Sequence, residues 1–161
     1  MLDISEQQKK WLEETIRLAI ENVRSGNGGP FGAIIVKDDI VIAKGTNIVT
    51  SVNDPTAHAE IVAIRAACKT LGTFQLDNCE LYSSCEPCPM CFGAINWARP
   101  MRVFYAGTRQ DAAKAGFDDS LIYDELLRPN ETKKIPFILI PLSNAQQPFE
   151  VWKNKEDKIR Y

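Results

Sequence analysis

The sequence predicts an α/β domain in three layers, with a mixed sheet of five strands between layers of helices. Short runs rich in β-branched residues alternate with longer segments of helical periodicity, which is typical of layered α/β domains. The first two of these runs are separated only by Asp38 and Asp39, so the sheet opens with an antiparallel hairpin and is mixed. The length of 161 residues, 45% of them hydrophobic, suits one domain with its own core.

The first predicted elements are a helix and the hairpin. An amphipathic helix is predicted over residues 5–24, and Gly26 just past its end is a typical stop. Its apolar positions recur at helical spacing: Leu12, Ile16, Ala19, Ile20 and Val23. The turn cluster GNGGPFG then leads into the two strands of the hairpin, over 33–37 and 40–45.

A polar loop over 47–56 precedes the second half of the fold. The helix after it, over 57–71, can be capped by Asp54 or Thr56 and stopped by Gly72. The later elements are a strand over 79–84, a helix over 89–98, a strand over 102–107, a loop over 108–118, a short helix over 119–127 and a strand over 136–142. The chain is therefore expected to be a single domain, 1–161, in which 141–161 is a helical tail that packs on this core or on a partner's.

Composition and charge exclude several classes of partner. The formal net charge is -2, without the basic face that a nucleic-acid binder needs, so no nucleic-acid partner is expected. No apolar run approaches the roughly 18 residues of a membrane span, and the N-terminal residues lack the pattern of a signal peptide. The protein is expected to be soluble and cytoplasmic, with no membrane partner.

Three of the five cysteines crowd into one heptapeptide, at Cys85, Cys88 and Cys91. In a reducing compartment such a cluster indicates a metal site before disulfides. Pro89 fits the first position of a helix and pushes the residue before it into an extended conformation. Cys88 then falls at the N-cap and Cys91 at the third helical position, where the free N–H groups favour thiolates. This geometry favours Cys88 and Cys91 as a ligand pair.

His58, the one histidine of the chain, lies with Glu60 in the first turn of the helix over 57–71. With Cys88 and Cys91 it would leave one position of a Zn²⁺ site for water, as in catalytic sites, whereas structural sites take four protein ligands. A structural Cys₃His clip that adds Cys85 is an alternative on spacing alone. Glu60 favours the catalytic site, because its carboxylate can take a proton from water and pass it on.

The combination of H-x-E at 58–60 and P-C-x-x-C at 87–91 resembles the signature of zinc-dependent base deaminases. The resemblance covers nearly the whole chain, from about residue 10 onward. It is to the cytidine-deaminase-like superfamily and, within it, to the bacterial guanine deaminases (guanine aminohydrolases) of the small zinc type. The segments that carry it are GGPFGAIIVKD, NDPTAHAEIVAIRAAC, SCEPCPMCFGAINWARP and AGFDDSLIY, together with Tyr161.

The resemblance implies a cytidine-deaminase-like fold and the hydrolytic deamination of guanine to xanthine and ammonia. It implies that His58, Cys88 and Cys91 bind one Zn²⁺ per chain and that Glu60 is the proton shuttle. It also implies a homodimer whose subunits exchange their C-terminal segments, so that Tyr161 would close the active site of the partner.

Five further residues receive roles from the resemblance. Asn47 and the backbone N–H of Ala59 would bind the base, and Phe31 and Trp97 would form walls of its pocket. Asp119 would aid proton transfer to the leaving ammonia. The residues alone also allow ordinary structural roles, since an Asn at a strand end often closes a turn, an Asp often caps a helix, and the two aromatic residues would suit a core.

Two alternatives to guanine deamination stay open on the sequence. One is deamination of another base or nucleoside, such as cytosine, guanosine or an adenosine in transfer RNA. The net charge of -2 disfavours the RNA substrate, because phosphate contacts need a positive surface. The other alternative is a non-catalytic zinc-binding module, which has no chemical use for Glu60.

Overall fold

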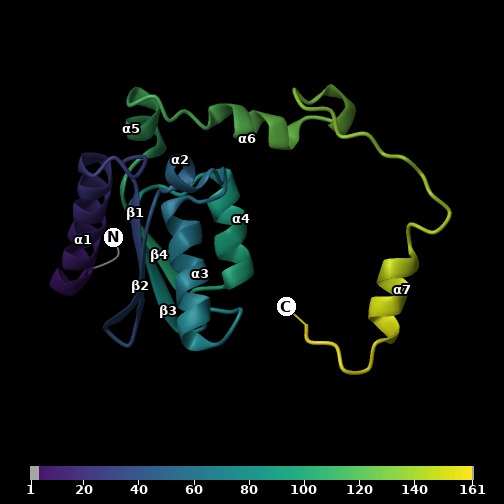
Figure 1. The fold of residues 1–161 in the computed structure, drawn as a ribbon, viewed down its shortest axis with the longest axis horizontal. Helices are drawn as coiled ribbons and strands as arrows, with labels where there is room; N and C mark the ends of the chain where they lie inside the picture. The colour runs from purple at the N-terminus through teal and green to yellow at the C-terminus, as the bar shows by residue number, and fades with distance from the viewer. Residues whose placement is uncertain (1–3, 161) are drawn as a thin grey trace. The chain divides into compact units, whose positions relative to one another are not determined.

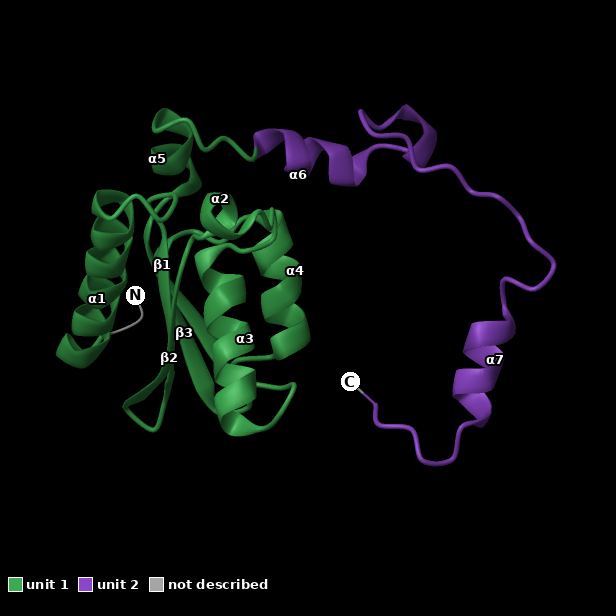
Figure 2. Ribbon diagram, viewed as in Figure 1, with its two compact units in different colours: residues 1–119 green, residues 120–161 purple. Residues whose placement is uncertain are grey.

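The structure is a computed structural model that describes residues 4–160. It divides into two compact units, residues 1–119 and residues 120–161 (Figure 2). The first unit contains the sheet and the candidate ligands of the metal. The single domain over 1–161 and the exchange of the tail stay predictions, and the exchange is taken up under the proposed function.

One mixed sheet forms the centre of the first unit, in the order β2-β1-β3-β4. Its strands are β1 (Gly32–Lys37), β2 (Ile40–Thr46), β3 (Cys79–Cys85) and β4 (Arg102–Gly107). β1 pairs antiparallel with both β2 and β3, whereas β3 and β4 are parallel, so the predicted hairpin and mixed sheet are confirmed. Asp38 and Asp39 both have positive φ, which matches the twist of a two-residue hairpin turn.

The predicted fifth strand is wrong, because residues 136–142 form no strand. They belong to the second unit, whose described residues are α6 (Ser120–Leu127), the 3₁₀ helix η1 (Asn130–Thr132), α7 (Gln147–Asn154) and connecting segments. A strand is stabilised by hydrogen bonds to a neighbouring strand, and the described part of this unit offers none. Pro136 and Pro141 also lack the N–H donors that a ladder needs. Within the described part of the tail, residues 141–160, α7 is the only helix.

Helices cover both faces of the sheet, as predicted (Figure 1). α1 (Glu6–Arg24) contacts β1 and β3 on one face, while α3 (Ala59–Leu71) and α4 (Pro89–Ala98) pack on the other. Alternate side chains of β1 point to opposite faces of the sheet. Ile34 packs with Trp11 and Leu12 of α1, and Ile35 packs on the face that α3 covers. Within residues 4–160, no helix is long and apolar enough to cross a bilayer.

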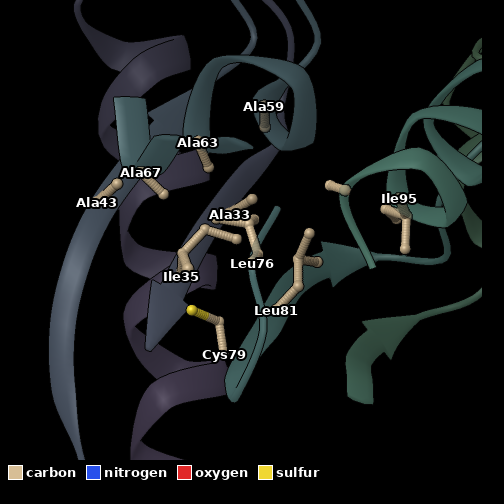
Figure 3. Packing of buried hydrophobic residues seen from close by; sticks show 11 residues of the cluster. Ala33, Ile35, Ala43, Ala59, Ala63, Ala67, Leu76, Cys79, Leu81 and Ile95 are labelled. Carbon is tan, nitrogen blue, oxygen red and sulfur yellow. The ribbon is translucent and has the colours of Figure 1, made fainter. Parts of the chain in front are cut away.

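α3 packs very closely on the sheet because its inward face is made of alanines. Ala59, Ala63 and Ala67 lie in one buried cluster with Ile35 (Figure 3). A Cβ atom at Gly45 of β2 would lie 2.2 Å from the carbonyl oxygen of Ala59, so a glycine is required there. The first turn of α3 is therefore held tightly against the sheet.

Two short helices lie where loops are predicted, namely α2 (Val49–Val52) and α5 (Arg109–Lys114). α5 begins with a capping box, in which the Thr108 hydroxyl accepts from the N–H of Asp111 at 3.3 Å. The Asp111 carboxylate accepts from the N–H of Thr108 at 3.1 Å in return. The loop prediction over 108–118 is wrong in part, because these reciprocal bonds start a helix after β4.

Candidate active site

His58 and Glu60 are positioned by the start of α3. His58 is the N-cap residue, with an extended backbone at φ -70° and ψ 158°, and Ala59 is the first helical residue. The expected caps lie too early in the chain, because Asp54 Oδ1 accepts from the N–H of Thr56 at 2.8 Å and closes the preceding turn instead. The side chain of His58 makes no capping bond.

Cys88 and Cys91 are positioned by the start of α4. Cys88 is the N-cap residue, with φ -65° and ψ 167°, and Pro89 opens the helix. This confirms the predicted start of the helix, where the N–H groups of the first turn have no partner within the helix. The first turns of α3 and α4 thus carry a histidine and two cysteines.

These two helix starts bring three possible ligand atoms together. The ligand atoms of His58, Cys88 and Cys91 all lie within 4.8 Å of one another. His58 Nδ1 is 3.5 Å from Cys88 Sγ and 3.6 Å from Cys91 Sγ. In a tetrahedral zinc site, bonds of about 2.3 Å to sulfur and about 2.0 Å to nitrogen place such atoms roughly 3.6 Å apart. The donor set and its spacing therefore fit Zn²⁺ with one position left open.

The thiols of this cluster differ strongly in acidity. Side-chain hydrogen bonding with Cys91, followed by that with His58, lowers the pKa of Cys88 to about 4. The same pairing, with burial, raises the pKa of Cys91 above that of a free thiol. The bond to Cys88 also raises the pKa of His58. Metal binding requires both cysteines as thiolates and His58 as a neutral ring, so it would release protons from this cluster.

Cys85 lies outside the cluster. Its Sγ donates to the carbonyl oxygen of Thr108 at 3.5 Å, at the start of α5. Burial raises the pKa of Cys85 to about 11, so it stays a protonated thiol near neutral pH. This placement supports three protein ligands and disfavours the Cys₃His clip.

Glu60 lies beside the cluster and is only 6% exposed. Its Oε1 accepts from the Ser83 hydroxyl at 3.2 Å, and its Oε2 accepts from the Cys91 thiol at 3.5 Å. Removal from water raises the pKa of Glu60, which moves this carboxyl toward the neutral range suited to a proton shuttle. A buried carboxylate at a site with an open ligand position can exchange protons with a water or substrate there.

Asn47, Phe31 and Phe117 gather around Gly29. A Cβ atom at Gly29 would lie 3.5 Å from a side-chain atom of each of the three. Phe31 and Phe117 meet edge to face, with ring centroids 5.1 Å apart. Asn47 is buried, and its Oδ1 accepts weakly from the N–H of Val49 at 3.3 Å. An amide beside two aromatic rings can bind a flat, polar ligand.

The remaining predicted site residues are Ala59, Asp119, Trp97 and Tyr161. Ala59 is buried at the start of α3. Burial first, and then the negative charge of Cys88, raises the pKa of Asp119. Trp97 of α4 is 64% exposed, so the core role that its residue type suggests is wrong. Tyr161 lies outside the described residues.

Comparison with known families shows which family the chain belongs to. Residues 5–107 match the model of the cytidine and deoxycytidylate deaminase zinc-binding region. The chain belongs to the cytidine and deoxycytidylate deaminase family. Members of this zinc-binding family are hydrolytic deaminases, and the matched region contains His58, Glu60, Cys88 and Cys91.

Within this deaminase family, the chain is similar to the guanine deaminase of Bacillus subtilis, with 58% identity over 94% of the chain and 97% of that protein. The X-ray structure of guanine deaminase from that organism aligns with a TM-score of 0.94 at 57% identity, over 95% of this chain and 98% of the other. A tRNA-specific adenosine deaminase of Aquifex aeolicus is 37% identical over 73% of the chain and 76% of its own length. A structure of guanine deaminase from Nitrosomonas europaea aligns with a TM-score of 0.66 at 32% identity, over 74% of the chain and 68% of the other.

Sequence reasoning missed two residues that contact predicted site residues. Phe117 lies inside the AGFDDS segment, but its residue type alone does not predict its contact with Phe31. Ser83 belongs to no motif, and only the pairing of β3 in the sheet brings it beneath Glu60. A serine within a strand carries no signal of its own.

Proposed function

We propose that the protein is a zinc-dependent guanine deaminase, which converts guanine and water to xanthine and ammonia. The observation that carries the proposal is the buried carboxylate of Glu60 beside the His58, Cys88 and Cys91 cluster. The choice of guanine is supported by the similarity to the guanine deaminase of Bacillus subtilis over nearly the whole of both chains.

The proposed reaction needs residues that hold zinc and a residue that transfers protons. His58, Cys88 and Cys91 would hold Zn²⁺, which when bound acidifies a water molecule in its open position. Glu60 would accept one proton from a water molecule while the water oxygen bonds to the carbon that bears the amino group, and Glu60 would then give that proton to the adjacent ring nitrogen. The second proton of the former water would pass to the amino group as the carbon–amine bond breaks, so that a carbonyl forms and ammonia leaves. One carboxylate therefore serves first as base and then as acid.

The other predicted site residues fit roles in orienting the base. The side-chain amide of Asn47 would donate to and accept from the ring edge, and the N–H of Ala59 would donate to it. Phe31 would contact the face of the base, with Phe117 behind it. Burial, followed by the negative charge of Cys88, raises the pKa of Asp119, and we assign this carboxyl the transfer of a proton to the leaving amino group. Trp97 is kept as a proposed pocket wall.

Substrate choice is the first prediction. Purified, zinc-loaded protein is expected to convert guanine to xanthine at least about 100-fold more efficiently than guanosine, cytosine or adenosine in transfer RNA. A pocket that hydrogen-bonds one base leaves its own buried polar groups unpaired with another, which costs this much or more. Ultraviolet absorbance follows guanine, guanosine and cytosine, and inosine formation reports on transfer RNA. A faster reaction of any competitor than of guanine would contradict the proposal, and the similarity to a tRNA-specific adenosine deaminase makes that comparison necessary.

We further propose a homodimer whose subunits exchange their C-terminal segments. The second unit carries large apolar side chains with high exposure, including 90% for Leu127, 88% for Leu139 and 77% for Ile138. Such surface is unfavourable in water, and a second subunit could bury it. The five cysteines are free, as a reducing cytoplasm would keep them, and we place the protein there.

Tail exchange leads to the second prediction. Removal of residues 157–161 is expected to lower kcat/KM for guanine about tenfold or more, because Tyr161 would no longer exclude water from the pocket. Co-refolding this truncated chain with a full-length Glu60→Gln chain is then expected to restore activity. In the mixed dimer, the intact tail of the inactive subunit would complete the site of the truncated one. Activity that is unchanged by truncation, or that is not restored on mixing, would count against exchange.

A further inference from the structure

Ser83 is a buried serine that faces the active-site side of the sheet. It is 1% exposed and lies in the centre of the sheet, opposite Ala33 of β1 and Tyr105 of β4. Leu81, two residues earlier, packs in the cluster on the α3 side, so Ser83 shares that face of β3. Its hydroxyl donates to Glu60 Oε1 at 3.2 Å.

Ser84 provides a contrast on the opposite face. It lines a groove together with Ile20 and Val23 of α1. Its hydroxyl accepts from the backbone N–H of Gly32 at 3.0 Å, and so ties β3 to the start of β1. The two adjacent serines therefore have different partners, one a titratable side chain and the other the backbone.

The two oxygens of Glu60 are held differently. Oε2 accepts from the thiol of Cys91, but a cysteine that ligates a metal is a thiolate and has no proton to donate. That bond is lost when the ligand cluster is filled, whereas the bond from Ser83 to Oε1 does not depend on the metal. In the loaded site Ser83 is thus the side-chain donor that the structure provides for this carboxylate. One oxygen is fixed, and the other faces the cluster.

We propose that Ser83 is a positioning residue that holds the carboxylate of Glu60 in the orientation needed for proton transfer. The expected loss of kcat rests on the proposed function. The expected displacement of Glu60 rests only on the geometry of the sheet. Without the hydroxyl, Oε1 lies buried without its donor, and the side chain turns to find another partner. The distance from Oε2 to the reacting water then varies, and proton transfer slows.

Three variants test this role by steady-state kinetics with guanine. Ser83→Ala is expected to lower kcat about tenfold to a hundredfold, the range typical of residues that orient an active-site group, with KM changed less than about threefold. Ser83→Thr keeps the hydroxyl and is expected to retain kcat within about threefold. Ser84→Ala removes the neighbouring hydroxyl on the other face and is expected to leave kcat within about twofold. Wild-type kcat in Ser83→Ala, or an equal loss in Ser84→Ala, would overturn the proposal.

Two further measurements separate positioning from general damage. In a Glu60→Gln background, Ser83→Ala should cause no additional loss of residual kcat, because Ser83 acts through Glu60; full additivity would contradict this. A crystal structure of the zinc-loaded Ser83→Ala protein should show Glu60 displaced or in more than one rotamer. An unmoved Glu60 would refute the inference whatever the substrate, whereas failure of the wild type to deaminate guanine would refute only the proposed function.

Discussion

Replacing Glu60 with glutamine is expected to reduce kcat for guanine about a thousandfold or more, while the zinc content stays at about one per chain. A positioned general base and acid contributes roughly 10²- to 10⁴-fold, and here one group serves in both steps. Glutamine has the same shape, and its amide oxygen can still accept from Ser83, so the fold and the ligand cluster should persist. An amide cannot take a proton from water, so only the chemical step is lost.

The experiment requires metal analysis and kinetics on the same preparation. Glu13→Gln, an exposed residue of α1, is the matched control and should have wild-type kcat and zinc content. Loss of zinc from Glu60→Gln would show that the carboxylate supports the ligand cluster. Full activity in that variant would exclude Glu60 as the proton shuttle and with it the mechanism proposed above.

Replacement of Cys85, Cys88 or Cys91 is expected to affect zinc binding very differently. Cys88→Ala and Cys91→Ala should each reduce bound zinc to below about 0.2 per chain and abolish turnover, because only two ligands would remain. Cys85→Ala should retain about one zinc per chain and most of the activity, since Cys85 donates to Thr108 outside the cluster. Atomic absorption on protein purified without added metal measures the difference.

Cys68→Ala is the matched control for removing a thiol elsewhere in the fold, because Cys68 packs against the hydrophobic core. It should lower stability modestly and leave zinc content unchanged. Loss of metal from Cys85→Ala would support the four-ligand Cys₃His clip and a non-catalytic module. Retention of metal by Cys88→Ala would show that another residue can take its place in the cluster.

The start of α4 could be predicted from the sequence because it depends on neighbours in the chain. Pro89 has no N–H and a restricted φ, so the helix begins there and Cys88 is extended. The hairpin could be predicted for the same reason, because its turn is closed by two neighbouring residues, Asp38 and Asp39. The sequence favours Asp54 or Thr56 as the cap of α3. In the structure these two residues bond to each other, and His58 is the N-cap.

The side chains around Gly29 depend on packing between distant segments. Phe31 and Phe117 meet there although they lie far apart in the chain, and neither residue type by itself predicts this contact. Trp97 suits a core by its residue type, yet α4 leaves it exposed. The fifth strand was expected because residues 136–142 are apolar, but a strand needs a neighbour, and pairing is not encoded in composition.

By itself, the sequence determined the layered fold, the ligand types and the helix start that selects Cys88 and Cys91, because each follows from periodicity or from contacts between near neighbours. Only the tertiary structure decided how the starts of α3 and α4 meet. Gly45 lets the backbone of α3 approach β2 so closely that a Cβ would lie 2.2 Å from a carbonyl oxygen, and this holds His58 and Glu60 in place. The same sheet brings Ser83 under Glu60, a contact that depends on strand register across many intervening residues.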